Sequence, residues 1–204
     1  MEQRINSICV FGASSSRVAG EYFDAAYRVG ELIAQAGCRM IFGAGDAGLM
    51  GAAARGCTNA GGSVIGVIPE KLNKKGIYFE GCAQRIETRT MHERKETMEE
   101  LAGGFIALAG GYGTIEEFME ALTLKQLSYF DKPIVLLNTL GYYNSLIAQL
   151  EDCIAGGFTS PGFRGLYAVC DTPEEAVEYC VGYRGMSIRD KLMDAVRDND
   201  GRKY

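Results

Sequence analysis

The sequence predicts an α/β fold, a single Rossmann-like domain in which a parallel sheet carries helices on both faces. Short apolar runs alternate with amphipathic helical patterns, which is the order of units that builds a parallel sheet. Glycine loops follow several of the apolar runs, and open α/β sheets bind ligands at the carboxyl ends of their strands. The chain has 204 residues, 47% of them hydrophobic and 23% charged, which suits one globular domain spanning 1–204.

The first half of the chain supplies four strands and three helices to this prediction. Gly37, Gly61-Gly62 and Pro69 separate them, because glycine and proline end helices and strands. The polar stretch at 70–81 is expected to be a surface loop. The predicted strands are 8–11, 39–42, 64–68 and 84–88, and the predicted helices are 22–33, 49–60 and 91–102.

The second half repeats the alternation. Strands are predicted at 105–109, 132–138 and 166–170, and helices at 114–125 and from Gly141 to Gly156. A last helix begins at Pro173, with Asp171 or Thr172 as its N-cap. Residues 185–204 are expected to form a C-terminal helical tail.

Composition excludes several classes of function. A net charge of −5 gives no broad attraction to nucleic acid or anionic membrane, and no apolar run approaches the ~20 residues of a membrane helix. The seven cysteines form no CxxC pair, so neither a disulfide framework nor a metal site is expected. These features favour a cytoplasmic protein whose partners include neither nucleic acid nor membrane.

The run from Phe105 to Lys125 is predicted to bind phosphate. An apolar strand leads into three glycines among the four residues 110–113, and Thr114 then opens an amphipathic helix. In this order backbone N–H groups converge on one point, where the helix dipole stabilises an anion by about 0.3–1 kcal/mol. Glu117 adds a carboxylate one turn inside the helix. The strand–loop–helix unit is therefore a candidate phosphate cradle.

A second glycine loop, Gly43 to Gly48, reads G-x-G-x-x-G between a strand and a helix. Alone it would suggest a dinucleotide site, which also needs an acidic residue at the end of the next strand. Here Pro69 precedes Glu70, a few residues too late, so the dinucleotide reading stays a minor alternative. The sequence lacks GxxxxGK[ST], which excludes P-loop hydrolysis.

Two charged residues have alternative interpretations. Arg94 shares a helix face with Met98, so it either extends past the helix edge, pairs with a core carboxylate, or enters the ligand cleft. Glu117 either closes a capping box with Thr114 or turns toward the cleft. His92, the only histidine, is interpreted as a structural residue at a helix start.

Two motifs in register resemble those of a known family. Residues 91–95 read MHERK and residues 109–117 read AGGYGTIEE. They resemble the MHxRK and PGGxGTxxE motifs of the Lonely Guy (LOG) family, the cytokinin riboside 5′-monophosphate phosphoribohydrolases, often labelled lysine decarboxylases. The segments VFGASSS, VIGVIPE, DKPIVLLN, GYYNSL and GGFTSP support the resemblance, which covers roughly residues 5–182.

The resemblance implies hydrolysis of the N-glycosidic bond of nucleoside 5′-monophosphates, AMP or N6-substituted, to free base and ribose 5-phosphate. It implies no cofactor and a homodimer or higher homo-oligomer. Arg94 and Glu117 would be the catalytic pair. The implied substrate-binding residues are Lys95, Gly110, Gly111, Tyr112, Gly113, Thr114, Glu116 and Thr123.

Four residues depart from the family pattern: Ala109 replaces a proline, Ala44 a glycine, Leu124 a tryptophan and Gly76 a glutamate. The first bears on phosphate geometry and the others on which base is preferred. The alternative function is a non-catalytic carrier of a phosphate-bearing ligand, since molybdenum cofactor carriers resemble this family.

Overall fold

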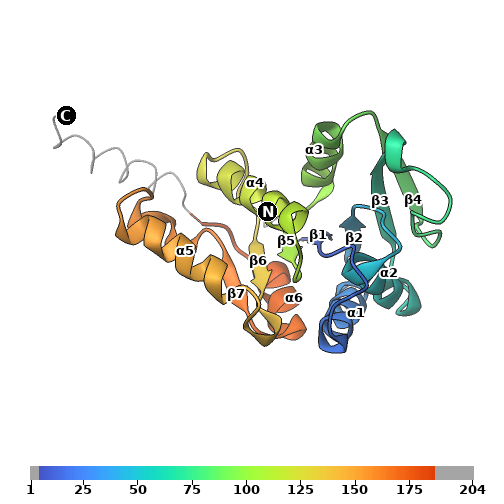
Figure 1. Ribbon diagram of the computed structural model, residues 1–204, viewed down its shortest axis with the longest axis horizontal. Coiled ribbons are helices and arrows are strands. Elements are labelled where there is room, and N and C mark those ends of the chain that lie inside the picture. Colours follow the sequence, from blue (N-terminus) through green and yellow to red (C-terminus); the bar gives the residue numbers. More distant parts are fainter. Residues whose placement is uncertain (1–4, 187–204) are drawn as a thin grey trace.

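The computed structural model describes residues 5–186, and these form one sheet of seven parallel strands (Figure 1). The strand order is β4-β3-β2-β1-β5-β6-β7, so the predicted Rossmann-like α/β fold is confirmed. The strands are β1 Ser7–Phe11, β2 Arg39–Phe42, β3 Val64–Pro69, β4 Gln84–Thr88, β5 Phe105–Ala107, β6 Ile134–Leu137 and β7 Ala168–Cys170.

Six α-helices among the described residues cover both faces of the sheet. They are α1 Gly20–Gln35, α2 Gly48–Asn59, α3 Met91–Leu101, α4 Tyr112–Gln126, α5 Asn144–Ala155 and α6 Pro173–Gly182. Side chains of β1 alternate between two cores: Val10 packs with α1, α2 and α6, whereas Phe11 packs with α3 and α4. Strands buried on both faces carry continuous apolar runs, which is why β1, β2, β3, β5 and β6 could be predicted, whereas the edge strand β4 is polar and mostly exposed.

The small residues of α2 allow an unusually close contact with α1. A Cβ on Gly30 would lie 1.9 Å from the carbonyl oxygen of Ala53, and one on Gly56 would lie 2.0 Å from that of Tyr27. Neither glycine can therefore be replaced without separating the helices.

The strand order reverses between β1 and β5, and this switch point positions the site. The chain adds β2, β3 and β4 on one side of β1 and then returns to place β5 on the other. Three loops meet there. Ala13 N–H donates to the carbonyl of Ala109 at 3.1 Å, and Leu49 N–H donates to the carbonyl of Ala13 at 2.8 Å. Open α/β sheets bind ligands at such a crevice.

Several predicted boundaries shift. β5 ends at Ala107, two residues early, and α4 begins at Tyr112, two residues early, with Gly111 as N-cap. α5 begins at Asn144 because a 3₁₀ turn, Thr139–Gly141, precedes it. A second 3₁₀ turn, Pro161–Gly165, shortens β7.

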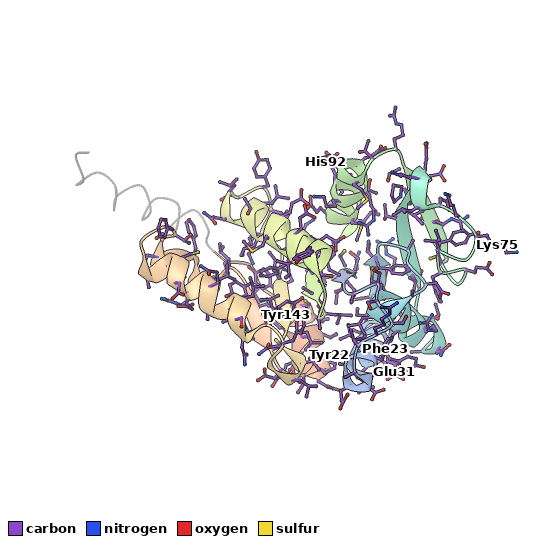
Figure 2. The ribbon with its side chains drawn as sticks, viewed as in Figure 1. Tyr22, Phe23, Glu31, Lys75, His92 and Tyr143 are labelled. Carbon is purple, nitrogen blue, oxygen red and sulfur yellow. The ribbon has the colours of Figure 1, made fainter. Side chains whose placement is uncertain are left out.

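Other expectations hold. Thr172 caps α6 in a complete capping box with Glu175, which decides between the two predicted caps. Residues 70–81 form a surface loop with one 3₁₀ turn, Glu70–Leu72, and Lys75 projects from it (Figure 2). Of the predicted helical tail at 185–204, residues 187–204 lie outside the described residues. No helix in 5–186 is both long and apolar enough to span a membrane.

Candidate active site

The phosphate-binding prediction falls on the N-terminus of α4. The first helical hydrogen bond is donated by Ile115 N–H to the carbonyl of Gly111, at 3.1 Å. The preceding N–H groups, up to Thr114, therefore have no acceptor within the helix and are available to an anion. Apart from the adjoining residues and the backbone of the helix itself, no atom of the described chain lies within 4 Å of a Cβ placed on Gly111 or Gly113. The space over both glycines is open to a ligand.

Gly110 and Thr114 close the base of this loop. A Cβ on Gly110 would lie 2.1 Å from Oγ1 of Thr114, so only glycine allows the threonine side chain to fold over the backbone there. Thr114 is buried. Tyr112 is 96% exposed, so its side chain points into solvent. Only its backbone N–H, at the start of α4, can contribute to the cradle.

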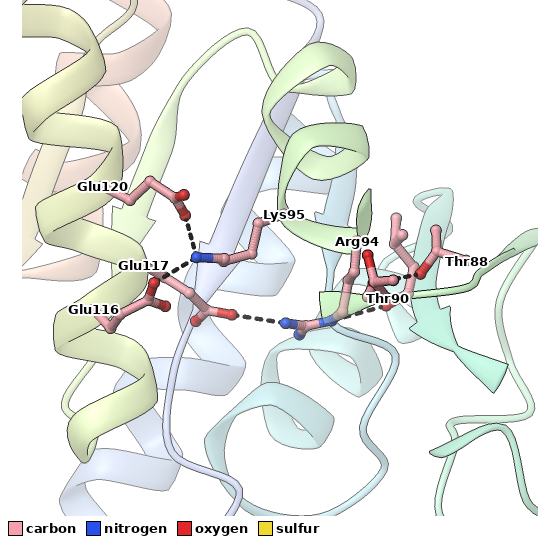
Figure 3. A network of polar contacts seen from close by, with 8 residues as sticks. Thr88, Thr90, Arg94, Lys95, Glu116, Glu117 and Glu120 are labelled. Carbon is pink, nitrogen blue, oxygen red and sulfur yellow. Dashed lines mark hydrogen bonds and ion pairs between the residues drawn. The ribbon is translucent and has the colours of Figure 1, made fainter. Parts of the chain in front are cut away.

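Arg94 and Glu117 lie side by side between α3 and α4 (Figure 3). Nη1 of Arg94 donates to Oε1 of Glu117 at 3.0 Å, and its Nε donates to the carbonyl of Val67 at 3.2 Å. Their side chains are 8% and 11% exposed. α3 supplies the arginine and α4 the carboxylate, so the pair bridges two helices on the same face of the sheet.

Gly43 provides the space for the guanidinium. A Cβ on Gly43 would lie 1.8 Å from Nη2 of Arg94. In a dinucleotide-binding loop the first glycine allows a tight turn and the second lets the backbone approach the pyrophosphate. Here an arginine guanidinium fills the space over the first glycine, Gly43, which counts against the dinucleotide alternative.

The capping-box interpretation of Thr114 and Glu117 is wrong. Because α4 begins two residues earlier than predicted, Gly111 is the N-cap and Thr114 already lies within the first turn. Glu117 bonds to Arg94 in α3. A full box forms at α6 instead, and Thr90 caps α3 by accepting from Glu93 N–H at 3.0 Å.

Burial governs the electrostatics of Glu117. Removal from water raises the pKa of its carboxyl group above the ordinary 4.5, and the charge and hydrogen bond of Arg94 limit that rise. The nearby carboxylate of Glu116 raises it further. The pKa of Glu117 therefore lies closer to neutral pH than that of a free glutamate side chain.

Lys95, predicted to bind substrate, is paired with two carboxylates. Its Nζ forms ion pairs with Glu116 and, at 2.6 Å, with Glu120 (Figure 3). The side chain of Lys95 is 11% exposed. Lys95 thus ties α3 to α4 one residue away from the Arg94–Glu117 pair.

Glu99 lies one turn after Lys95 on α3. Burial and the nearby charge of Glu120 raise the pKa of Glu99 to about 7, while Lys95 and Lys132 act in the opposite direction. The α3–α4 contact therefore contains an acid that titrates near neutral pH.

Other predicted residues lie apart from the cradle. Thr123 is exposed, and its hydroxyl donates to the carbonyl of Met119 at 2.7 Å. At 1.5 Å per residue it lies roughly 13 Å along α4 from Thr114. His92 is exposed in the first turn of α3, at the helix start that the sequence predicted (Figure 2).

The departures at 44, 76 and 124 also lie outside the cradle. Ala44 is fully buried with a φ of 60°, and its methyl group lies over Gly66 in β3. The added methyl therefore points into the sheet. Gly76 is exposed in the surface loop, and Leu124 is half-buried near the C-terminal end of α4.

Two groups near the cradle were not predicted as functional. Ser14, Ser15 and Ser16 follow β1 and are exposed at the switch point, next to the backbone of Gly48. The tyrosines 142 and 143 bond to the loop that precedes α4. A serine run directly after the first strand is a readable signal, whereas the tyrosine contacts depend on how distant segments pack.

Comparisons with known proteins agree on one family. A family model described as possible lysine decarboxylase matches residues 50–180. Cytokinin riboside 5′-monophosphate phosphoribohydrolase LOG1 of Arabidopsis thaliana is 38% identical over 183 residues, 90% of this chain and 86% of that protein. A protein of Oryza sativa subsp. japonica, named probable cytokinin riboside 5′-monophosphate phosphoribohydrolase LOGL6, is 38% identical over 183 residues, 90% of this chain and 73% of that protein.

Solved structures share the fold at lower identity. The molybdenum cofactor carrier protein of Chlamydomonas reinhardtii matches with a TM-score of 0.67 and 24% identity, over 88% of this chain and 100% of that chain. The molybdenum cofactor binding protein of Rippkaea orientalis matches with a TM-score of 0.65 and 22% identity, over 95% and 98%. At these identities the likeness concerns the fold alone.

We predict that Glu99→Gln raises the melting temperature at pH 8 and changes it little at pH 4.5. The raised pKa means that the folded chain holds this proton more tightly, so the associated stability is complete below 4.5 and is lost as pH rises through about 7. Glutamine removes the charge that the fold disfavours. The exposed Glu100→Gln is the control, and an equal gain for Glu99→Gln at both pH values contradicts the prediction.

Proposed function

Because this chain belongs to the Lonely Guy family of cytokinin riboside 5′-monophosphate phosphoribohydrolases, we propose that it hydrolyses the N-glycosidic bond of nucleoside 5′-monophosphates. The proposed substrates are AMP and its N6-substituted, cytokinin-type relatives. The products are the free base and ribose 5-phosphate. The observation that carries the proposal is the buried Arg94–Glu117 pair, placed one helical turn from an open phosphate-binding N-terminus.

The chemistry needs a carboxylate. Breaking the bond between C1′ and the base leaves the electron pair on the base nitrogen and builds positive charge on the ribose ring, as in an oxocarbenium ion. Glu117 stabilises that charge and orients the water whose oxygen forms the new bond to C1′. The water loses a proton and the departing base gains one, so the reaction consumes one water molecule.

Arg94 keeps this carboxylate ionised and in place. Its Nη1 holds Glu117 and its Nε is fixed by Val67, so the guanidinium has little freedom to turn away. Its remaining N–H groups suit ribose and phosphate oxygens, because the planar guanidinium presents several donors in fixed directions. Arg94 thus couples binding of the sugar phosphate to the position of the acid.

The phosphate supplies binding energy away from the reacting bond. The N–H groups at the start of α4 hold the 5′-phosphate, and the exposed hydroxyls of residues 14–16 line the neighbouring loop. Binding energy at a remote group positions the glycosidic bond over Glu117. A nucleoside without the phosphate is therefore a poor substrate. We further propose that the enzyme is a homodimer or higher homo-oligomer.

The second candidate is a carrier of a phosphate-bearing ligand, which the shared fold of the molybdenum cofactor carriers favours. A carrier has no need of a buried acid whose pKa is raised beside the ligand. The Arg94–Glu117 pair therefore favours hydrolysis, and the two candidates differ in one measurable respect, the release of a free base.

We expect the protein to release adenine from AMP and Glu117→Gln to lower kcat by at least about 100-fold, since an electrostatic or acid–base group of this kind contributes that much. Chromatography of the products measures both. A panel of AMP, GMP, CMP, isopentenyladenosine monophosphate and adenosine then tests the base and the phosphate requirement. Binding of AMP without release of adenine would favour the carrier.

We expect Gly43→Ala to lower kcat/KM by about 10- to 100-fold while the fold is retained, because the new methyl group displaces the guanidinium of Arg94. The control is Gly182→Ala, where a Cβ meets no atom within 4 Å. In an Arg94→Gln background Gly43→Ala should cost nothing further, since residues acting as a unit are not additive. A full additional loss in that background contradicts this role for Gly43.

We expect kcat/KM to fall on the acid side as Glu117 becomes protonated, at a pH above the ordinary 4.5 of a glutamate. The phosphate of AMP also titrates, at about 6, so the diagnostic is a shift between variants. Glu116→Gln removes a charge that raises the pKa of Glu117, and should move the acid limb to lower pH. An upward shift is inconsistent with Glu117 acting as the carboxylate.

A further inference from the structure

Three consecutive carbonyl groups lead into the phosphate loop, and each accepts a hydrogen bond from outside it. Oη of Tyr143 donates to the carbonyl of Leu108 at 2.6 Å. Ala13 N–H donates to the carbonyl of Ala109 at 3.1 Å. Oη of Tyr142 donates to the carbonyl of Gly110 at 2.6 Å. The connection between β5 and α4 is thus held along three successive peptide groups.

Fixing these carbonyls also fixes the N–H groups that follow them. A trans peptide group is planar, and its C=O and N–H point in opposite directions. The carbonyl of Gly110 is held toward Tyr142, so the N–H of Gly111 is directed to the other side. Successive N–H groups directed into one concavity make an anion site. The external donors therefore hold the loop in an orientation that suits phosphate.

The local sequence makes such support necessary. Ala109 leaves φ free at the position before the first glycine, where a proline would fix it near −65°. Gly110, Gly111 and Gly113 are more permissive still. Without contacts from elsewhere, this segment would sample many orientations and lose entropy on binding an anion.

A turn after β6 presents the two tyrosines. Leu140 and Gly141 both have positive φ, 55° and 73°, and they reverse the chain between β6 and α5. Oδ1 of Asn138 accepts from the N–H of Tyr143 at 2.8 Å, which holds the turn to the end of the strand. Ring contacts fix the hydroxyls, since the Tyr142 ring lies 4.9 Å from that of Tyr143 and 5.9 Å from that of Tyr22.

Tyr143 is 2% exposed and Tyr142 is 44% exposed. The first is therefore part of the core and the second reaches the surface beside the cradle. Tyr22 of α1 and Tyr143 both contact the ring of Tyr142, and Figure 2 labels the two outer tyrosines of this cluster. Removing the hydroxyl of Tyr142 therefore disturbs the core less than removing that of Tyr143, and it still removes a hydrogen bond to the loop.

We propose that Tyr142 and Tyr143 are positioning residues for the 5′-phosphate. Their hydroxyl groups orient the peptide groups between Leu108 and Gly111, and thereby the loop that binds the phosphate. This inference rests on the proposed function, because it assigns the phosphate of the nucleotide to that loop. Neither tyrosine touches the reacting bond. Loss of either hydroxyl group lowers the affinity for phosphate and leaves the chemical step at Arg94 and Glu117 unchanged.

The test is Tyr142→Phe, which keeps the ring contacts and removes one hydrogen bond. We expect KM for AMP to rise about 5- to 10-fold, the size of one hydrogen bond, with kcat within about twofold of wild type. Inhibition constants for inorganic phosphate and ribose 5-phosphate should rise by the same factor. The inhibition constant for adenine, which lacks phosphate, should not change. Tyr22→Phe removes a hydroxyl from the same ring cluster and is expected to leave all these values unchanged.

Several outcomes overturn the proposal. A lower melting temperature with unchanged KM and phosphate inhibition would mean that the Tyr142 hydroxyl is only structural. An equal loss of adenine and phosphate affinity would place its effect elsewhere in the site. Calorimetric binding of inorganic phosphate to wild type and Tyr142→Phe separates this inference from the proposed function, because it does not depend on hydrolysis. A wild type that cleaves no nucleotide but binds phosphate more tightly than the variant sinks the function and keeps the positioning role.

Discussion

The ion pair between Arg94 and Glu117 is the interaction on which the arrangement of the site depends. Removing two charges from water costs several kcal/mol per ion, and mutual attraction recovers this only when the remaining polar groups are satisfied. Here the carbonyl of Val67 accepts a hydrogen bond from the guanidinium, and Gly43, which has no side chain, leaves the space that the guanidinium occupies. Replacing a buried ion pair by apolar residues of similar volume is often neutral or stabilising, which fits the proposed role of these charges toward a ligand.

That pair in turn requires α3 and α4 to keep a fixed register across the switch point of the sheet. Lys95 holds the two helices together through Glu116 and Glu120, immediately beside the pair. The start of α4 is fixed to the same frame by hydrogen bonds from the loop after β1 and from the turn after β6. The Arg94–Glu117 pair and the proposed sugar and phosphate sites therefore share one support, which a reaction governed by positioning needs.

Much of the fold, and the location of the candidate site, could be predicted from the sequence. Apolar runs such as those of β1 and β6 predicted buried strands, and residues 105–125 predicted a strand, a glycine loop and a helix, because both signals are local. Anion binding at that loop stays a prediction. The direction of Glu117 was not legible. The letters T-I-E-E fit a capping box equally well, and only the start of α4 at Tyr112, set by packing against the sheet, decides against it. The space that Gly43 leaves for Arg94 joins residues 51 apart in the sequence, and the bond from Tyr142 to Gly110 joins residues 32 apart. No local sequence pattern can predict contacts of this kind.

The contact between α1 and α2 has a mechanical consequence for the crevice. Gly30 and Gly56 bring backbone against backbone, so these helices behave as a single stiff plate that carries both the serine loop after β1 and the glycine loop after β2. Replacing either glycine would separate the two helices and shift both loops at once, although Arg94 and Glu117, on the opposite face of the sheet, would be chemically unaltered.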